Sequence, residues 1–373
     1  MYCWLRLNAG TGKSTLVKFI IAALGLNPDT DVVYCTFTGK AATVLRHKGC
    51  PNAMTAHKLL YHSKRLASGK FYFRPKPWLD ECPKLIIVDE ISMLPKDLWE
   101  LLLKHKVHVI ACGDPEQLPP VSKDSDNHVL DEPHIFLDEI MRQAAESEII
   151  QLTMAIREGK YINEYKGTEV QVIDEKDVVD GMYHWADQIV VATNRKRLEI
   201  NEFMRKSLGH ETDDPEPSEK VICLQNAWDI MDTTEQISLV NGTIGYIEEI
   251  KEEIMNYPIY NFPLVPVYKM TIKTEDGETF KDLIVDKQAI QTGKKFLTPQ
   301  QEYQLAQKAK HMPEIEIPLE FNFGYAITGH KAQGSEWGKV LVVEENFPFD
   351  KTEHRRWLYT CCTRPSEKLV LVR

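Results

Sequence analysis

The sequence of 373 residues has few of the features that mark membrane, secreted or fibrous proteins. No apolar run approaches the roughly 20 residues of a transmembrane helix, and the opening Met1-Tyr2-Cys3-Trp4 does not start a signal peptide. The eight cysteines form no CxxC pair, which disfavours a disulfide framework or a zinc site. With 19 glycines and 20 prolines, the chain is not fibrous. We therefore expect an intracellular, cytoplasmic protein (in the host cytoplasm if it is viral) with no membrane partner.

Basic residues are also scarce overall, with 45 Lys and Arg against 55 Asp and Glu. The net charge of −10 disfavours nucleic-acid binding, because phosphate contacts need cations. The deficit is local, however. Residues 1–79 hold twelve basic residues and only two acids, Asp29 and Asp31, so this stretch carries +10 and the other 294 residues carry −20.

Aromatic residues are interleaved with the end of this basic stretch: Tyr61, Phe71, Tyr72, Phe73 and Trp78. Cations for phosphates and flat rings for bases are what binding of single-stranded nucleic acid requires. The alternative is a basic surface with a few aromatics that belong to the core.

The first half of the chain alternates short aliphatic runs with helical patterns, which predicts an α/β fold with a parallel sheet covered by helices. Apolar spacing predicts helices over 15–24 and 146–160. A second α/β series begins near residue 188 and resumes at the end of the chain. The predicted strands of both series are 2–7, 32–36, 85–88, 107–111, 188–192, 340–343 and 369–372.

The pattern changes between residues 240 and 316, which we interpret as a small β-rich insertion. Its predicted strands are 245–250, 267–273 and 279–285, and a helix is predicted over 299–311. The last two strands are joined by Glu275-Asp276-Gly277-Glu278, a typical hairpin turn.

The segment Ala9-Gly10-Thr11-Gly12-Lys13-Ser14-Thr15 lies between a predicted strand and a predicted helix, as a phosphate-binding loop does. Glycines allow backbone N–H groups to approach phosphates, and the following helix adds a favourable dipole. Lys13 is predicted to bridge the β- and γ-phosphates, and Ser14 to bind Mg²⁺. ATP and Mg²⁺ are therefore the predicted ligands, although Leu7 stands where the pattern has its first glycine.

Two further motifs follow apolar strands. Asp89 and Glu90 end the run 85–88, where Asp89 is predicted to hold Mg²⁺ and Glu90 to orient and deprotonate an attacking water. Gln117 lies in Gly-Asp-Pro-Glu-Gln-Leu-Pro-Pro after the next strand, and is predicted to sense the γ-phosphate. The alternative for this last motif is a proline-rich turn.

With these three motifs in order, the chain resembles the superfamily one DNA helicases of subgroup B, close to the RecD and Dda type. Phe37 stands where that family has proline, and Cys361-Cys362 where it has small apolar residues. The segments similar to its other motifs are Thr38–Ala42 (motif Ia), Met54–Leu60 (Ib), Arg142-Gln143 (IV), Thr193-Asn194 (a DNA-contacting element), Val240–Gly245 (the start of an SH3-like insertion), Gly324–Glu336 (V) and Trp357–Arg364 (VI).

The resemblance implies two RecA-like parallel-sheet domains, with a small insertion in the first and an SH3-like β-rich insertion in the second. Domain 1A would comprise 1–60 and 84–136, and its insertion 1B, at 61–83, would carry a strand-separating pin. Domain 2A would comprise 137–239 and 317–373, and insertion 2B would be 240–316. A monomer is expected.

The resemblance also implies an ATP-dependent 5′→3′ DNA helicase that translocates on single-stranded DNA and unwinds duplexes, with single strands and junctions as partners. The implied catalytic residues are Lys13, Glu90, Gln117, Arg142 and Arg364, and the two arginines would close on ATP from the second domain. The implied DNA contacts are Thr38, Lys40, Thr55, His57, Phe71, Phe73, Thr193, Asn194, Asn241, Thr328, His330 and Lys331.

The sequence also allows two alternative functions. One is a translocase without efficient unwinding, and another is a weakly hydrolysing DNA-binding protein. The second arises because only eight residues precede Ala9 and none is the adenine-reading Gln of the family. Together with Leu7, this suggests a shortened N-terminus and an altered ATP affinity. His57 and His330 have a structural alternative as buried histidines, and the motifs do not distinguish DNA from RNA.

The pin assignment generates a first prediction. Phe71→Ala or Phe73→Ala should weaken duplex unwinding more than DNA-stimulated ATP hydrolysis, because a pin acts at the junction and not in the motor. Strand displacement and ATPase assays on each variant measure the two activities. Equal loss of both would rule out a pin at these residues.

Overall fold

The computed structural model describes residues 2–7, 13–50, 52–65, 71–80, 82–119, 133–137, 146–160, 162–234, 237–312, 315–345 and 350–373, with the backbone alone at 7, 13–15, 63–65 and 71–73. The chain divides into two compact units. Unit 1 is Met1–Tyr61, Pro75–Leu198 and Ala326–Arg373, and unit 2 is His62–Arg74 and Glu199–Tyr325. None of the helices described combines the length and apolar character needed to span a bilayer.

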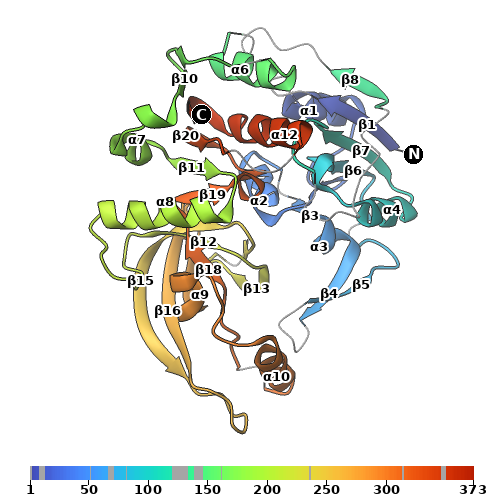
Figure 1. Cartoon of the computed structure of the whole chain (residues 1–373). Helices are drawn as coiled ribbons and strands as arrows, with labels where there is room; N and C mark the ends of the chain where they lie inside the picture. The colour runs from blue at the N-terminus through green and yellow to red at the C-terminus, as the bar shows by residue number, and fades with distance from the viewer. Residues whose placement is uncertain are drawn as a thin grey trace. The chain divides into compact units, whose positions relative to one another are not determined.

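The first sheet of unit 1 has the strand order β3-β2-β6-β7-β1-β8, and all of its pairs are parallel (Figure 1). The strands 2–7, 32–36 and 85–88 are confirmed to the residue. The strands are β1 (Tyr2–Leu7), β2 (Val32–Thr36), β3 (Ala53–Thr55), β6 (Leu85–Val88), β7 (His108–Gly113) and β8 (Ile135–Leu137). The helices between them are α1 (Lys13–Ala23), α2 (Gly39–His47), α3 (Ala56–Leu60) and α4 (Lys96–Lys104).

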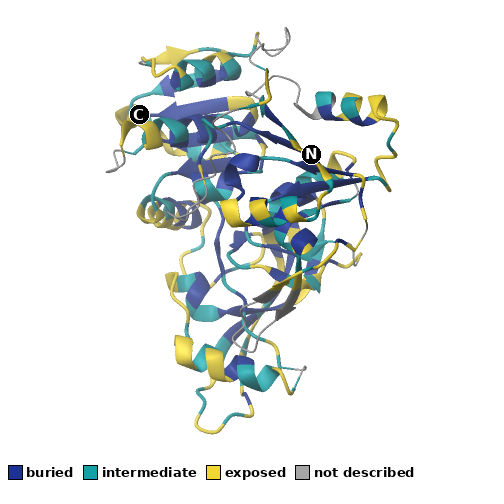
Figure 2. Cartoon of the chain, turned by 90° about the vertical axis from the view of Figure 1, so that its right-hand side faces the viewer, coloured by how far each residue is buried: buried dark blue, intermediate teal, exposed yellow. Residues whose placement is uncertain are grey.

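Both faces of this sheet are buried, which explains the unbroken apolar run of β6. Ile86 and Val88 contribute to one hydrophobic cluster, whereas Leu85 and Ile87 contribute to another. Alternate residues of a strand point to opposite faces, so a parallel strand covered by helices on both sides is apolar throughout. The buried strands appear dark blue in Figure 2.

The second sheet of unit 1 has the order β19-β11-β20-β21-β10-β9, in which only the β9–β10 pair is antiparallel. Its strands are β9 (Tyr165–Lys166), β10 (Val170–Ile173), β11 (Gln188–Val191), β19 (Ala326–Thr328), β20 (Trp337–Val343) and β21 (Pro365–Val372). The helices of this part are α6 (Glu148–Arg157), α7 (Asp180–Trp185), α8 (Asn194–Ser207), which continues into unit 2, α11 (Gly329–Ala332) and α12 (Lys351–Cys362). Helices α6 and α12 pack side by side (Figure 1).

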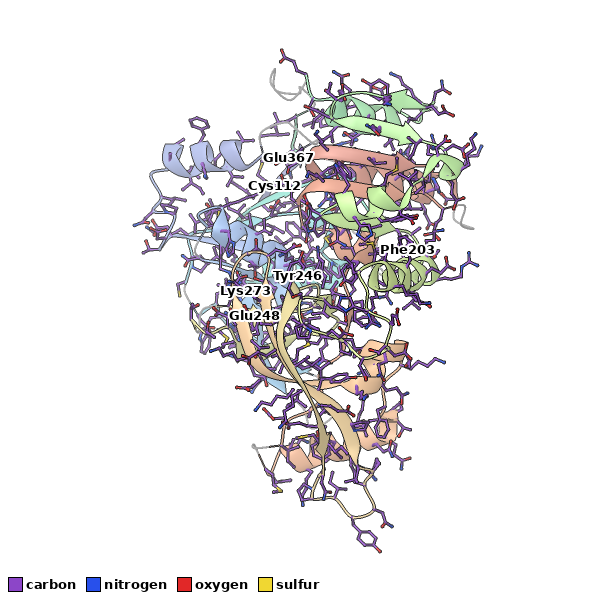
Figure 3. All side chains as sticks on the ribbon, turned by 90° about the vertical axis from the view of Figure 1, so that its left-hand side faces the viewer. Cys112, Phe203, Tyr246, Glu248, Lys273 and Glu367 are labelled. Atoms are coloured by element: carbon purple, nitrogen blue, oxygen red, sulfur yellow. The ribbon has the colours of Figure 1, made fainter. Side chains whose placement is uncertain are left out.

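Unit 2 holds an antiparallel sheet with the order β17-β16-β15-β12-β18. The predicted turn at Glu275–Glu278 does join two of its strands, and Tyr246 and Lys273 are register partners on neighbouring strands (Figure 3). Its strands are β12 (Lys220–Cys223), β15 (Ile244–Met255), β16 (Val265–Thr274), β17 (Thr279–Asp286) and β18 (Phe321–Phe323). Because β12 and β18 complete this sheet, it extends beyond the predicted limits 240–316 at both ends.

The smaller elements of unit 2 are two strand pairs and two helices. Strands β4 (Tyr61–Arg65) and β5 (Phe71–Pro75) form a two-stranded sheet, as do β13 (Ala227–Met231) and β14 (Ser238–Leu239). Helix α9 (Lys287–Thr292) follows β17, and α10 (Pro299–Ala309) lies within the predicted helix 299–311. The insertion predicted at 61–83 therefore contains a strand pair with the Phe71 and Phe73 backbones on its second strand.

The first residue of α6 ties that helix to the second sheet. The Glu148 carboxylate accepts backbone N–H groups from Thr168 at 3.1 Å, Glu169 at 2.8 Å and Val170 at 3.0 Å. These bonds lower the pKa of Glu148 to about 2. A Cβ at Gly167 would clash with this carboxylate and force it to shift, so glycine leaves room for these bonds.

The hydrogen bonds to the Glu148 carboxylate predict how the stability of the protein depends on pH. Since folding lowers its pKa, Glu148 contributes stability above its ordinary pKa of about 4.5, and this is lost as pH falls toward 2. Glu148→Gln, which turns an amide NH₂ toward the same donors, should lower the melting temperature at pH 7 and progressively less below pH 4.5. Glu367→Gln, at an exposed position (Figure 3), is the control. A difference in melting temperature between Glu148→Gln and wild type that does not change with pH would contradict this role of Glu148.

Candidate nucleotide site and nucleic-acid interface

The predicted phosphate loop falls between two elements that the structure does describe. Strand β1 ends at Leu7 and helix α1 begins at Lys13. Gly10, Thr11 and Gly12 lie outside the described residues, as do the side chains of Lys13, Ser14 and Thr15. The strand and the helix that such a loop needs are thus present on either side of it.

The carboxylates predicted to act on Mg²⁺ and water follow β6 directly. The Asp89 N–H donates to the Cys35 carbonyl at 2.8 Å, and the Glu90 N–H donates to Asp89 Oδ1 at 2.9 Å. Glu90 has φ +51°, an uncommon left-handed conformation that turns the chain sharply at this point. The strand end is therefore held firmly, with both carboxylates at the carboxyl edge of the sheet.

Two buried oxygens at this edge have no donor among the described residues. They are Glu90 Oε2 and Gln117 Oε1. Their residues follow β6 and β7, which are neighbours in the sheet. A buried acceptor without a hydrogen bond costs about 1–3 kcal/mol. Such a pair therefore fits a site that a ligand or water with donors completes, as the sequence predicted for ATP hydrolysis.

The loop that carries Gln117 is bound to helix α12 through its even-numbered residues. The Tyr359 hydroxyl donates to Asp114 Oδ2 at 2.5 Å, and Arg355 donates to Glu116 Oε2 at 2.9 Å. The Leu118 N–H donates to Thr360 Oγ1 at 2.9 Å. This loop, residues 114–118, thereby joins the first sheet to the helix that precedes β21.

A further bond links the same loop to the segment resembling motif V. Gln333 Nε2 donates to the Leu118 carbonyl at 2.9 Å, so both backbone groups of Leu118 are bound by side chains of the second sheet's elements. Gln333 is 3% exposed and Thr360 is fully buried. In a buried setting such bonds are strong, and breaking one leaves an unpaired polar group.

Arg364 approaches the candidate water-activating carboxylate. Its Nη1 lies 4.0 Å from Glu90 Oε1, and its guanidinium donates to the Thr360 carbonyl at 3.0 Å and to Thr363 Oγ1 at 2.9 Å. At 6% exposure the arginine is buried, so its charge acts at Glu90 through a low dielectric. The structure thus brings Glu90 and Arg364 together, whereas Arg142 lies outside the described residues.

Two of the four threonines predicted to contact DNA, Thr38 and Thr55, cap helices with their side chains. Thr38 Oγ1 accepts the Ala41 N–H at 3.2 Å and begins α2, and Thr55 Oγ1 accepts the Lys58 N–H at 3.2 Å and begins α3. Each cap leaves the hydroxyl hydrogen for another acceptor. Thr38 and Thr55 therefore stand at helix starts at the carboxyl edge of the first sheet, and Lys40 lies in the first turn of α2.

The two predicted histidines are half-buried. Burial lowers the pKa of His57 and of His330 below the ordinary histidine value, so both rings are neutral at pH 7. The His57 ring stacks 6.0 Å from Tyr61 and lies 6.0 Å from Phe37. A neutral, packed ring suits hydrogen bonding or stacking better than charge attraction to phosphate.

Thr193 has a partner that the sequence did not point out. Its hydroxyl donates to Glu345 Oε1 at 2.7 Å, and the N–H groups of Ala192 and Thr193 donate to Glu345 Oε2 at 2.8 Å. The neighbouring Asn194 Oδ1 accepts from Arg197 Nε at 3.2 Å. Glu345 therefore fixes the start of α8, and the only signal for it was its place at the end of a predicted strand.

The segment resembling motif V lies close to α2. Gly334 has φ +75°, and a Cβ there would come within 2.8 Å of the Ala41 Cβ, so both backbone conformation and space require glycine. Lys48 Nζ pairs with Glu336 Oε2 at 3.1 Å. Of the other predicted DNA contacts, Thr328 precedes α11, His330 and Lys331 lie on it, and the Asn241 N–H in unit 2 donates to Asn226 Oδ1.

Comparisons with known proteins agree with this geometry. Residues 2–182 match the family model of an AAA domain, and residues 323–372 match that of the UvrD-like helicase C-terminal domain. The chain is 28% identical over 379 residues to the ATP-dependent RecD2 DNA helicase of Deinococcus radiodurans, covering 96% of this chain and 45% of that protein. Over 118 residues it is 34% identical to the ATP-dependent DNA helicase dda of Enterobacteria phage T4, covering 30% of this chain and 27% of that protein.

A solved structure shares the fold. The Pif1 helicase from Bacteroides in complex with ADP-AlF3 and ssDNA has a TM-score of 0.54 at 17% identity, over 99% of this chain and 87% of that chain. The present chain spans less than half the length of the two curated relatives.

The parallel sheets, together with the similarity to a solved Pif1 helicase, identify the fold as that of a RecA-like helicase core. Within that class, the chain is similar in sequence to the RecD2 and dda DNA helicases, and it shares its fold with a Pif1 helicase.

The bond between Tyr359 and Asp114 generates a prediction. Tyr359→Phe removes the hydroxyl and leaves a carboxylate that is 4% exposed without its closest donor. We expect a loss of about 1–3 kcal/mol in the free energy of unfolding, measured by urea denaturation. Tyr303→Phe, on a side chain that is 55% exposed, is the control and should change little. A loss no larger than the control's would contradict this role.

Proposed function

We propose that this protein is an ATP-dependent 5′→3′ DNA helicase that translocates on single-stranded DNA and unwinds duplexes. The observation that carries the proposal is the set of bonds from loop 114–118 to α12, together with the approach of Arg364 to Glu90. A nucleotide that moves loop 114–118 or Glu90, which follow strands of the first sheet, would then also move α12 or Arg364 next to the second sheet. The names of the RecD2 and dda helicases support the same reading.

The nucleotide would bind at the start of α1, with Lys13 on its phosphates and Gly10 to Thr15 supplying backbone N–H groups. Ser14 and Asp89 would hold Mg²⁺, which supplies charge neutralisation at the phosphates when bound. Glu90 would orient the attacking water and take its proton, and Gln117 would sense the γ-phosphate. In the described part of the chain, the buried oxygens Glu90 Oε2 and Gln117 Oε1 have no donor, which fits these two roles.

Arg364 and Arg142 would stabilise the charge that develops on the transferred phosphoryl group. In the structure described here the Arg364 guanidinium lies 4.0 Å from Glu90, so it already faces the reacting edge of the first sheet. Loss of the γ-phosphate would be felt by Gln117 and passed through Leu118 and Asp114 to α12. Hydrolysis and movement of the two sheets would thereby be coupled.

Single-stranded DNA would run along the basic stretch of the first 79 residues, with the strand-separating pin on β4–β5. Phosphates would be contacted mainly by the helix starts of α2 and α3, by the start of α8 and by the segment around α11. The solved Pif1 complex with ssDNA supports a single strand as the ligand of this fold. Within the proposal, 1–60 with 84–136 and 137–239 with 317–373 are the two motor domains, 240–316 is an SH3-like insertion, and the protein acts as a monomer.

The proposal predicts ATP hydrolysis that single-stranded DNA stimulates. Lys13→Ala should reduce the rate by about a hundredfold or more, because a preorganised charge on the phosphates is lost. Phosphate release with and without an oligonucleotide measures this, and a tailed duplex separates unwinding from translocation alone. No stimulation by DNA, or full activity of Lys13→Ala, would refute the motor.

A further inference from the structure

Trp78 differs from every other tryptophan of the chain. The structure describes all seven, and Trp78 alone is exposed, at 73%. Indole is the largest apolar side chain and dominates binding energetics where it contacts a partner. The other six are buried or half-buried: Trp4, Trp99, Trp185, Trp228, Trp337 and Trp357.

The segment that carries Trp78 is held against the end of α3. The Lys76 N–H donates to the Leu60 carbonyl at 2.8 Å, and Lys76 Nζ donates to the Lys58 carbonyl at 3.0 Å and to Asp80 Oδ2 at 2.6 Å. On the other side of the tryptophan, Leu79 is buried in the core of the first sheet. The indole is thus presented to solvent by a fixed backbone, with little rearrangement needed on binding.

The sequence around Trp78 is suited to an anionic ligand with flat rings. Residues 53–79 include six basic residues and no acid, and the first acid after them, Asp80, pairs with Lys76. The six are Lys58, Lys64, Arg65, Lys70, Arg74 and Lys76. Helix α3, to which the Trp78 segment is bonded, begins with Thr55 and His57, two predicted contacts to the strand. An exposed aromatic among cations is the arrangement by which proteins stack the bases of single strands.

We infer that Trp78 is a nucleobase-stacking contact for a single strand that passes along α3. This rests on the proposed function, since it assumes that a single strand occupies the basic stretch. It is separate from the pin assignment, because Trp78 lies on the fixed segment after β5 and not on the β4–β5 strands themselves. The ligand class is the base of a single-stranded nucleic acid, held by its face and without sequence preference.

Affinity for two oligonucleotides tests this inference. Fluorescence anisotropy would give the Kd of wild type, Trp78→Ala and Trp78→Phe for a labelled single strand, and for a strand of equal length whose central nucleotides are abasic. We expect Trp78→Ala to bind the base-bearing strand about fivefold to a hundredfold more weakly, with Trp78→Phe in between. On the abasic strand the three proteins should bind alike. Tyr260→Ala, at a position 93% exposed, is the control and should match wild type.

The possible results distinguish failure of the Trp78 stacking contact from failure of the proposed function. If wild type binds the base-bearing strand and Trp78→Ala binds it equally well, the stacking contact is wrong and the proposed function stands. Equal weakening on both strands would also overturn it, because the loss would not depend on a base. If wild type binds neither strand, the proposed function and this inference both fail. Melting temperatures of the variants check that the substitutions leave the fold intact.

Discussion

The bonds between loop 114–118 and helix α12 are the constraint on which the rest of the candidate site depends. Asp114 and Leu118 are anchored to Tyr359 and Thr360, all four of them buried. Between them, the Gln117 side-chain oxygen has no donor among the residues that the structure describes. A loop bound at alternate residues cannot move at one end only. In the proposed mechanism, a ligand that displaces Gln117 would therefore also displace α12 and Arg364, which follows that helix two residues after its end.

Much of the fold could be predicted from the sequence, and the failures have a physical pattern. Strands β1, β2 and β6 were predicted to the residue because each is a short and largely apolar run. Strands β2 and β6 are buried along their whole length, and β1 is buried at Trp4 and Leu5. The short strands β3, β8 and β9, of three, three and two residues, were not predicted. Their pairing comes from the sheet beside them and not from their own residues. Strands β12 and β18, which lie outside the predicted β-rich segment 240–316, were missed for the same reason, since they pair across about a hundred residues of sequence.

Candidate site residues could be predicted where they lie within a recognisable sequence motif. Glu90, Gln117 and Arg364 could be named because motifs order them along the chain, and the structure brings Glu90 and Arg364 together. Glu345 and Tyr359 received no role, because their importance lies in partners 152 and 245 residues away. Net charge alone was equally uninformative, because the total of −10 includes a charge of +10 on residues 1–79. The structure adds that Lys76 of this basic stretch is bonded to Lys58 on α3, next to the segment that carries Trp78.

The central claim is that nucleotide chemistry at the first sheet alters the grip on a single strand through loop 114–118. Thermodynamic linkage requires that the nucleotide and the strand change each other's affinity if they act on the same elements. The most direct test is the Kd of a labelled single strand measured with a non-hydrolysable ATP analogue and again with ADP. We expect the Kd to differ by about fivefold or more between the two nucleotides, in the range typical of coupled sites. Equal affinities in the two states would contradict it.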